Sequence, residues 1–195
     1  MSLLQGVRVL DASTVIAAPF AAALMGDFGA EVIKVEMPGK GDPFRALGPY
    51  HDKKPMRWAT MGRNKKSITL DLRNEKGKAL FLRLVEKSDV LIENFRTGTM
   101  DKWGLDIDTL HKANPKLVVT RVTGYGQTGP YAMQAGFGTP ATAFSGMLLS
   151  ASSGVYFATM PESAAIFPSG SLTKDAVPAI ITLLYFVFVP HGFPS

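Results

Sequence analysis

The chain has 195 residues, with 21 lysines and arginines, 16 aspartates and glutamates, and no cysteine. The length suits one domain of ordinary size, and the lack of cysteine excludes disulfides, thiolate nucleophiles and cysteine-ligated zinc, and fits a reducing, cytoplasmic compartment. The net charge of +5 is a mild excess spread among acidic residues, so a small anionic ligand is expected rather than nucleic acid.

The first part of the chain predicts a strand, a helix and a second strand. Val7–Leu10 is a short apolar run, and residues 20–28 are rich in helix-forming residues. Pro19 suits the first turn of that helix, and Gly29 suits the left-handed residue that ends it. Glu31–Val35 then predicts the second strand. No signal peptide is expected before the first strand.

The turn after the first strand is a candidate anion site. Asp11, Ser13 and Thr14 follow the strand directly, and the amides at the start of a helix can receive an anion. The simpler interpretation, that Asp11 and Ser13 only cap the turn, is equally well supported. The turn lacks the glycine patterns of dinucleotide and P-loop sites, which disfavours NAD, FAD and ATP.

Residues 37–66 form a long polar connection, which predicts a functional or disordered segment. At its end Arg63, Lys65 and Lys66 precede the next strand, so three positive charges could lie together at one end of the sheet. The simpler alternative is a solvated loop edge.

Three further strands are predicted at Ser67–Leu70, Val90–Ile92 and Leu117–Val122. A helix over residues 74–87 lies between the first two, with Asn74 as its cap. Its expected apolar stripe consists of Ala79, Leu80, Leu82, Leu84 and Val85. Strands that alternate with helices predict an α/β fold, in which helices flank a Rossmann-like parallel sheet.

The later part of the chain offers fewer signals. The glycine-rich segment 124–138 has no basic residue, so it does not fit a phosphate-binding loop. The apolar run Ala176–Val189 is shorter than the roughly 20 residues that cross a bilayer and contains Pro178, so we expect a buried helix or strand and no membrane span. The three histidines are scattered, and no metal site is predicted.

Five segments in this order resemble the family III coenzyme A transferases, or CaiB/BaiF family: LLQGVRVLDAS, APFAAALMGDFGAEVIKVE, RNKKSITLDL, DVLIENFRTGTMDKWGL and VTGYGQTGPY. The resemblance implies transfer of coenzyme A from an acyl-CoA to a carboxylic acid, with no tightly bound cofactor. It also implies a homodimer of two interlocked, two-domain chains. Residues 1–195 would then be the amino-terminal part of the large domain that binds coenzyme A, without the small domain and the returning carboxyl-terminal segment.

The resemblance assigns a set of residues to the coenzyme A site. They are Val15, Ile16, Ala17, Leu70, Asp71, Leu72, Arg73, Asn94, Phe95, Arg96 and Lys102. Met37 departs from the family pattern, because relatives commonly carry an arginine there for the adenosine side. Lys40 and Arg45 are the candidates to compensate for it.

The family mechanism uses one aspartate as a covalent nucleophile. An ungapped comparison puts that position on Ser171, which cannot perform the carboxyl exchange, so Asp175 is the candidate. Two alternatives stay open: an α-methylacyl-CoA racemase-like enzyme, disfavoured by Phe137 and Gly138 where those relatives carry a His-Asp pair, and a catalytically inactive remnant that binds coenzyme A.

Overall fold

The computed structural model describes residues 2–136 of the chain. Asp175, the apolar run at residues 176–189, and Phe137 and Gly138 lie outside the described residues. The sequence predictions that concern them therefore stay predictions.

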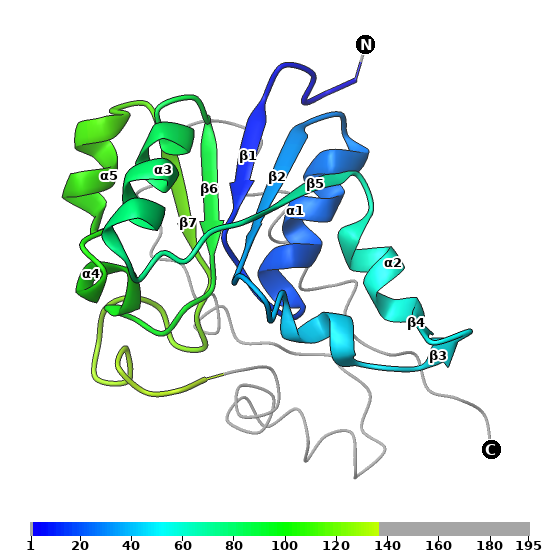
Figure 1. Cartoon of the computed structure of the whole chain (residues 1–195). Coiled ribbons are helices and arrows are strands. Elements are labelled where there is room, and N and C mark those ends of the chain that lie inside the picture. The colour runs from blue at the N-terminus through cyan, green and yellow to red at the C-terminus, as the bar shows by residue number, and fades with distance from the viewer. Residues whose placement is uncertain (1, 137–195) are drawn as a thin grey trace, which may run out of the picture.

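A five-stranded parallel sheet forms the centre of the fold, with strand order β5-β2-β1-β6-β7 (Figure 1). Its strands are β1 Arg8–Asp11, β2 Glu31–Glu36, β5 Lys65–Thr69, β6 Val90–Glu93 and β7 Val118–Arg121. All five strands predicted from the sequence are confirmed, to within two residues at each end. Consecutive residues of β1 point to opposite faces, so Val9 joins one hydrophobic core and Leu10 the other.

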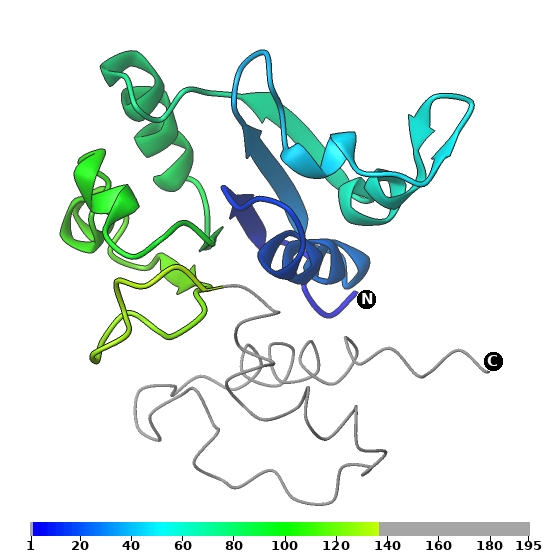
Figure 2. The same ribbon diagram turned by 90° about the horizontal axis from the view of Figure 1, so that it is seen from below.

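Helices cover both faces of the sheet, which confirms the predicted α/β class. α1 Ala17–Asp27 packs on one face, whereas α3 Glu75–Val85 and α5 Ile107–Ala113 lie on the other (Figure 2). The short helix α4 Thr99–Lys102 follows β6 on the side of α3 and α5. The fold therefore has three layers, with the sheet in the middle.

α1 fits closely on the sheet because its buried face consists largely of small residues. Ala18 and Ala22 are fully buried among the strand side chains. Pro19 lies in the first turn, and Gly29 adopts a φ of +95° just after the helix, as the sequence predicted.

α3 is confirmed, but its predicted apolar stripe is partly wrong. The Asn74 side chain caps the helix by accepting a hydrogen bond from the Gly77 amide at 2.8 Å. The buried residues are Gly77, Phe81 and Val85, which are spaced four apart, whereas Ala79 and Leu80 are exposed. A Cβ on residue 77 would lie 1.9 Å from the Asp71 carbonyl oxygen, so this position requires glycine.

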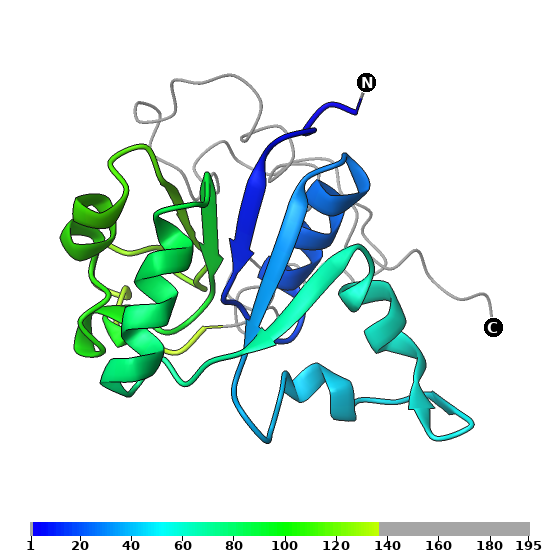
Figure 3. The same cartoon turned by 45° about the horizontal axis from the view of Figure 1, so that its top comes forward.

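The connection 37–66 was predicted to be a functional or disordered segment, and the regular elements in it contradict disorder. It contains the 3₁₀ helix η1 Pro43–Ala46, the hairpin strands β3 Tyr50–His51 and β4 Lys54–Pro55, and α2 Met56–Gly62. The hairpin projects from the molecule beyond the β5 edge of the sheet (Figure 3). These elements are short, so tertiary contacts rather than local propensity hold them in place.

The strand order has a functional consequence. The chain builds β1, β2 and β5 outward in one direction and then returns to add β6 and β7 on the other side of β1. The loops after β1 and β6 therefore diverge, and ligands of open parallel sheets bind in the crevice that such a divergence opens at the carboxyl ends of the strands.

Candidate ligand-binding site

A cleft of about 90 Å³ lies at the carboxyl ends of the strands. Residues that follow β1, β2, β5 and β6 line it, among them Ser13, Met37, Leu70, Leu72, Arg73 and Phe95. The lining is mainly apolar, with a few charged side chains at its margin. Apolar walls with few convergent polar groups are typical of small-molecule sites.

Glu36, at the end of β2, is an ionised carboxylate in the wall of this cleft. Both of its oxygens accept hydrogen bonds from the Arg45 guanidinium at 2.7 Å, and Ser67 Oγ donates to Oε1 at 2.5 Å. Burial opposes ionisation, but the hydrogen bonds from Arg45, Ser67 and the Asp42 amide outweigh it and lower the pKa of Glu36 to about 2. Glu36 is therefore a fixed negative charge.

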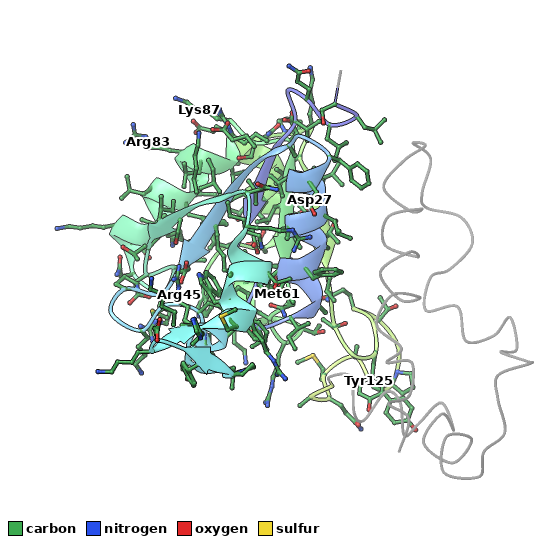
Figure 4. The ribbon with its side chains drawn as sticks, turned by 90° about the vertical axis from the view of Figure 1, so that its right-hand side faces the viewer. Asp27, Arg45, Met61, Arg83, Lys87 and Tyr125 are labelled. Atoms are coloured by element: carbon green, nitrogen blue, oxygen red, sulfur yellow. The ribbon has the colours of Figure 1, made fainter. Side chains whose placement is uncertain are left out.

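Arg45 is paired with two of its neighbours. Besides Glu36, its guanidinium lies over the Trp58 ring, 3.9 Å from the centroid. Figure 4 shows Arg45 beside the ribbon of α2, the helix that carries Trp58. Arg45 was a candidate to compensate for the arginine missing at residue 37. Its side chain is already paired with Glu36 and Trp58.

Arg73 lies beside Met37 instead. Its Nη2 is 3.4 Å from the Met37 sulfur, and its Nε and Nη2 donate to the Asp71 carboxylate at 2.8 and 2.9 Å. The hydrogen bonds from Arg73 lower the pKa of Asp71 to about 2. This exposed ion pair thus places a guanidinium against residue 37, where the family resemblance led us to expect an arginine.

Asn94 joins the two loops that diverge from the sheet. Its side-chain oxygen accepts from the Thr14 amide at 2.8 Å, and its Nδ2 donates to the Thr14 carbonyl oxygen at 2.8 Å. The next residue, Phe95, packs edge-on against Trp103 with ring centroids 5.0 Å apart. Both aromatic side chains line the cleft.

Glu93, at the end of β6, is buried with few hydrogen-bond donors. Its Oε2 accepts from the Phe95 amide at 2.7 Å, and Arg121 Nε lies 3.5 Å from its Oε1. Burial raises the pKa of Glu93 to about 7, because these partners and the repulsive Asp101 carboxylate do not offset the desolvation. Glu93 therefore titrates near neutral pH.

The structure brings several residues of the predicted site together. Leu70, Leu72, Arg73 and Phe95 line the cleft, Asp71 holds Arg73, and Asn94 holds the loop after β1. The loop after β1 continues through Val15 and Ile16 into α1, which begins at Ala17. Arg96 follows Phe95 and is exposed at the surface. Lys102 is the last residue of α4, and Trp103 follows it. Contact of these residues with a ligand stays a prediction.

The sequence suggested that three positive charges could lie together at one end of the sheet. The structure instead gives each of them, Arg63, Lys65 and Lys66, its own acidic partner. Arg63 pairs with Asp27, and Lys66 pairs with Glu31 at 2.7 Å. The Lys65 side chain is only 2% exposed and binds Asp11 at 2.8 Å. The solvated-edge alternative is also wrong for Lys65.

The sequence reasoning also missed two side chains that line the cleft. Trp103 and Glu36 both line the cleft, although neither was singled out. Trp103 lies in the segment DVLIENFRTGTMDKWGL quoted above, and the presence of a tryptophan there is the available signal.

The glycine-rich segment lies at the same edge of the sheet as the cleft (Figure 1). Its two described ends touch, because a Cβ on Gly124 would lie 2.5 Å from the Gly136 Cα. The Tyr125 and Tyr131 rings pack against each other at a centroid distance of 5.8 Å. Glycine is thus needed where the backbone crosses itself, which is a packing role.

Among residues 2–136, no helix has the length and apolar character needed to cross a membrane.

Comparison with known proteins gives a consistent result. The model of CoA-transferase family III matches residues 4–172. The chain is 46% identical over 180 residues to the succinyl-CoA–L-malate CoA-transferase alpha subunit of Chloroflexus aurantiacus, covering 91% of this chain and 40% of that protein. It is 41% identical to the acetyl-CoA:oxalate CoA-transferase of Acetobacter aceti, covering 97% of this chain and 45% of that protein.

A solved structure agrees in fold. The crystal structure of a CaiB/BaiF family protein from Brucella suis superposes with a TM-score of 0.71 at 31% identity, covering 95% of this chain and 50% of that one. The chain thus spans half or less of the length of each of these relatives.

Proposed function

The chain belongs to CoA-transferase family III, and we propose that its cleft at the carboxyl ends of the strands binds coenzyme A or an acyl-CoA. One observation carries this proposal. Leu70, Leu72, Arg73 and Phe95, which the family resemblance assigns to coenzyme A, come from two separate loops and line the same cleft. The topology supports the same place, since the cleft lies where the loops after β1 and β6 diverge.

The chemistry of the cleft fits a nucleotide thiol ester. Leu70, Leu72 and the Phe95–Trp103 pair offer apolar and aromatic surface to an adenine ring. Arg73 stands at the margin, where a guanidinium can bind phosphate oxygens in a bidentate manner. The rest of the ligand is proposed to run outward past Lys102 and the loop after β1.

For the whole protein we propose transfer of coenzyme A from an acyl-CoA donor to a small carboxylic acid. The relatives named above act, by their names, on succinyl-CoA with malate and on acetyl-CoA with oxalate. Residues 1–195 are proposed to be the amino-terminal part of the large domain, and a homodimer is proposed as the active assembly. One of those relatives is named as an alpha subunit, so a heteromer is an outcome that a test of assembly can distinguish.

Asp175 is proposed as the nucleophile. Its carboxylate attacks the donor thioester and expels coenzyme A as a thiolate, which leaves a mixed anhydride. The thiolate attacks the aspartyl carbonyl, forms an aspartyl thioester and releases the donor acid. The acceptor carboxylate then attacks this thioester and expels the thiolate, which takes the acceptor acyl group from the second anhydride and restores the Asp175 carboxylate.

Titration calorimetry with coenzyme A tests the binding proposal. Arg73→Ala should weaken binding about tenfold, as expected for the loss of a charge-assisted contact to phosphate. Arg83→Ala is the matched control, because Arg83 lies on the exposed side of α3, away from the cleft (Figure 4). A folded chain that does not bind coenzyme A, or equal loss in both variants, would contradict the proposal.

Acyl exchange between succinyl-CoA and a free dicarboxylic acid tests the reaction separately. Exchange that Asp175→Asn abolishes would support Asp175 as the nucleophile. Binding of coenzyme A without exchange would select the non-catalytic alternative for this chain.

A further inference from the structure

Four charged side chains meet in the interior beneath the loop after β1. They are Asp11 from β1, Lys34 from β2, Lys65 from β5 and Asp42 from the turn before η1, and none is more than 2% exposed. Lys34 Nζ lies 3.0 Å from Asp42 and 3.7 Å from Asp11, and Lys65 Nζ lies 2.8 Å from Asp11. Two positive and two negative charges thus compensate one another, as buried charges require.

Each member of this buried charge cluster also binds the backbone of the segment 13–19. Asp11 Oδ1 accepts from the Ser13 amide at 3.1 Å, and Lys34 Nζ donates to the Ser13 carbonyl oxygen at 2.7 Å. Asp42 Oδ1 accepts from the Val15 amide at 3.1 Å, and Lys65 Nζ donates to the Pro19 carbonyl oxygen at 2.6 Å. The segment is therefore held by side chains from distant parts of the sequence.

Val15 shows why this support matters. Its φ is +68°, in the left-handed region that a β-branched residue rarely adopts. Such a conformation persists only where the surroundings impose it. The carboxylate of Asp42 is the acceptor that receives the Val15 amide in this conformation.

We propose that Asp42 is a positioning residue: by accepting the Val15 amide while Lys34 balances its charge, it fixes the loop after β1 in the conformation that receives the ligand. Asp42 is itself anchored, since its amide donates to Glu36 at 2.9 Å and its Oδ1 also accepts from the Phe44 amide at 2.8 Å. The inference rests on the proposed coenzyme A site for its effect on affinity. The effect on the loop does not depend on any ligand.

A double-mutant cycle tests the proposal in the whole chain. Glycine adopts positive φ without steric cost, so Val15→Gly removes the strain that Asp42 offsets. Asp42→Ala should weaken coenzyme A binding about tenfold when residue 15 is valine and less than about threefold when it is glycine, each relative to its own parent. An equal loss in both backgrounds would overturn the proposal, because a merely structural role of Asp42 would not depend on residue 15.

Asp89→Ala is the matched control. Asp89 also accepts a backbone amide, that of Arg8 at 2.8 Å, but at the opposite edge of the sheet. It should leave the affinity for coenzyme A unchanged. A loss that matches the effect of Asp42→Ala would show a general effect of removing a carboxylate and would overturn the proposal.

Amide hydrogen exchange in the unliganded wild-type chain tests the loop itself, even where Asp42→Ala does not fold. The Val15 amide, with its exchange rate measured relative to that in the unfolded chain, should be protected at least about tenfold more than the Gly39 amide in the turn after β2, and pairing with a buried carboxylate is the reason. Equal protection of the two amides would overturn the proposal. Slow exchange at Val15 in a chain that does not bind coenzyme A would retain Asp42 as the residue that holds the loop and reject the proposed ligand.

Discussion

Buried carboxylates are compensated differently in the two halves of the carboxyl edge of the sheet, the first at β1, β2 and β5 and the second at β6 and β7. At the ends of β1, β2 and β5, two lysines balance Asp11 and Asp42, and Arg45 and Ser67 satisfy Glu36. At the ends of β6 and β7, Glu93 has one amide donor and a distant arginine. Within the described residues, the buried atoms without a hydrogen-bond partner are Thr97 Oγ1, Arg121 Nε, Thr123 Oγ1 and Gln127 Nε2 in the second half or beyond it, and Asp42 Oδ2 in the first half, which pairs with the Lys34 charge at 3.0 Å.

The two carboxylates differ in the hydrogen-bond donors around them and in how strongly burial desolvates them. The side chains of Glu36 and Glu93 are 3% and 5% exposed, yet the pKa of Glu36 is lowered to about 2 and that of Glu93 is raised to about 7. Four hydrogen bonds, two from Arg45 and one each from Ser67 and the Asp42 amide, stabilise the charge of the first carboxylate, whereas desolvation dominates the second. Glu36 therefore stays charged near neutral pH, whereas Glu93 changes its protonation there.

Lys34→Met should remove the charge compensation in the first half and cause the largest loss of unfolding free energy among these predictions. It leaves Asp42 without a counter-charge and Asp11 with only one, and loss of one partner of a buried pair typically costs about 3–5 kcal/mol. Urea denaturation measures the change. Lys66→Met is the control, since the Lys66 side chain is 75% exposed, and it should change the unfolding free energy by less than about 1 kcal/mol. Equal effects would mean that the buried charge pairs of the first half contribute no more to stability than an exposed pair.

Titration of Glu93 should produce the next largest effect. Between pH 4.5 and 7 the unfolded chain has released this proton while the native chain keeps it, so stability falls as the pH rises through this window. The pKa difference corresponds to at most about 3 kcal/mol. Thermal unfolding from pH 5 to pH 8 measures the change, and Glu93→Gln should remove this part of it. A pH profile unaffected by Glu93→Gln would contradict the raised pKa.

Glu36 should show the opposite dependence and a smaller effect. Its lowered pKa adds stability that is fully present above about pH 4.5 and is lost as the pH falls toward 2. Because the Arg45 side chain is 41% exposed, solvent screening reduces the contribution to about 1–2 kcal/mol. Acid unfolding of Glu36→Gln beside the wild type measures it. The variant should lose less stability than the wild type between pH 5 and pH 3. An equal loss would contradict the lowered pKa of Glu36.

The sequence predicted the parts of the fold that depend on local pattern. The five strands are short apolar runs, and α3 has its cap in Asn74, so both are visible without tertiary information. The buried side of α3 was less accurate because Leu80 is as apolar as Phe81, and only packing decides which of them faces the core.

The site depended on contacts between distant segments and was predicted less well. Lys65 was taken for a surface charge, yet it reaches Asp11, 54 residues earlier in the chain. No local pattern reveals such a pairing. The elements between residues 37 and 66 were missed for the same reason, since the Arg45–Trp58 contact joins η1 to α2 across the hairpin.

Amide hydrogen exchange of the whole chain with and without coenzyme A tests the central claim most directly, because it reports both binding and its place. Coenzyme A should slow exchange in the loops after β1, β5 and β6, at residues 12–16, 70–73 and 94–97, and leave the amino-terminal edge of the sheet at residues 28–31 unchanged. Absence of protection in these loops at saturating coenzyme A, with the chain folded, would contradict the account.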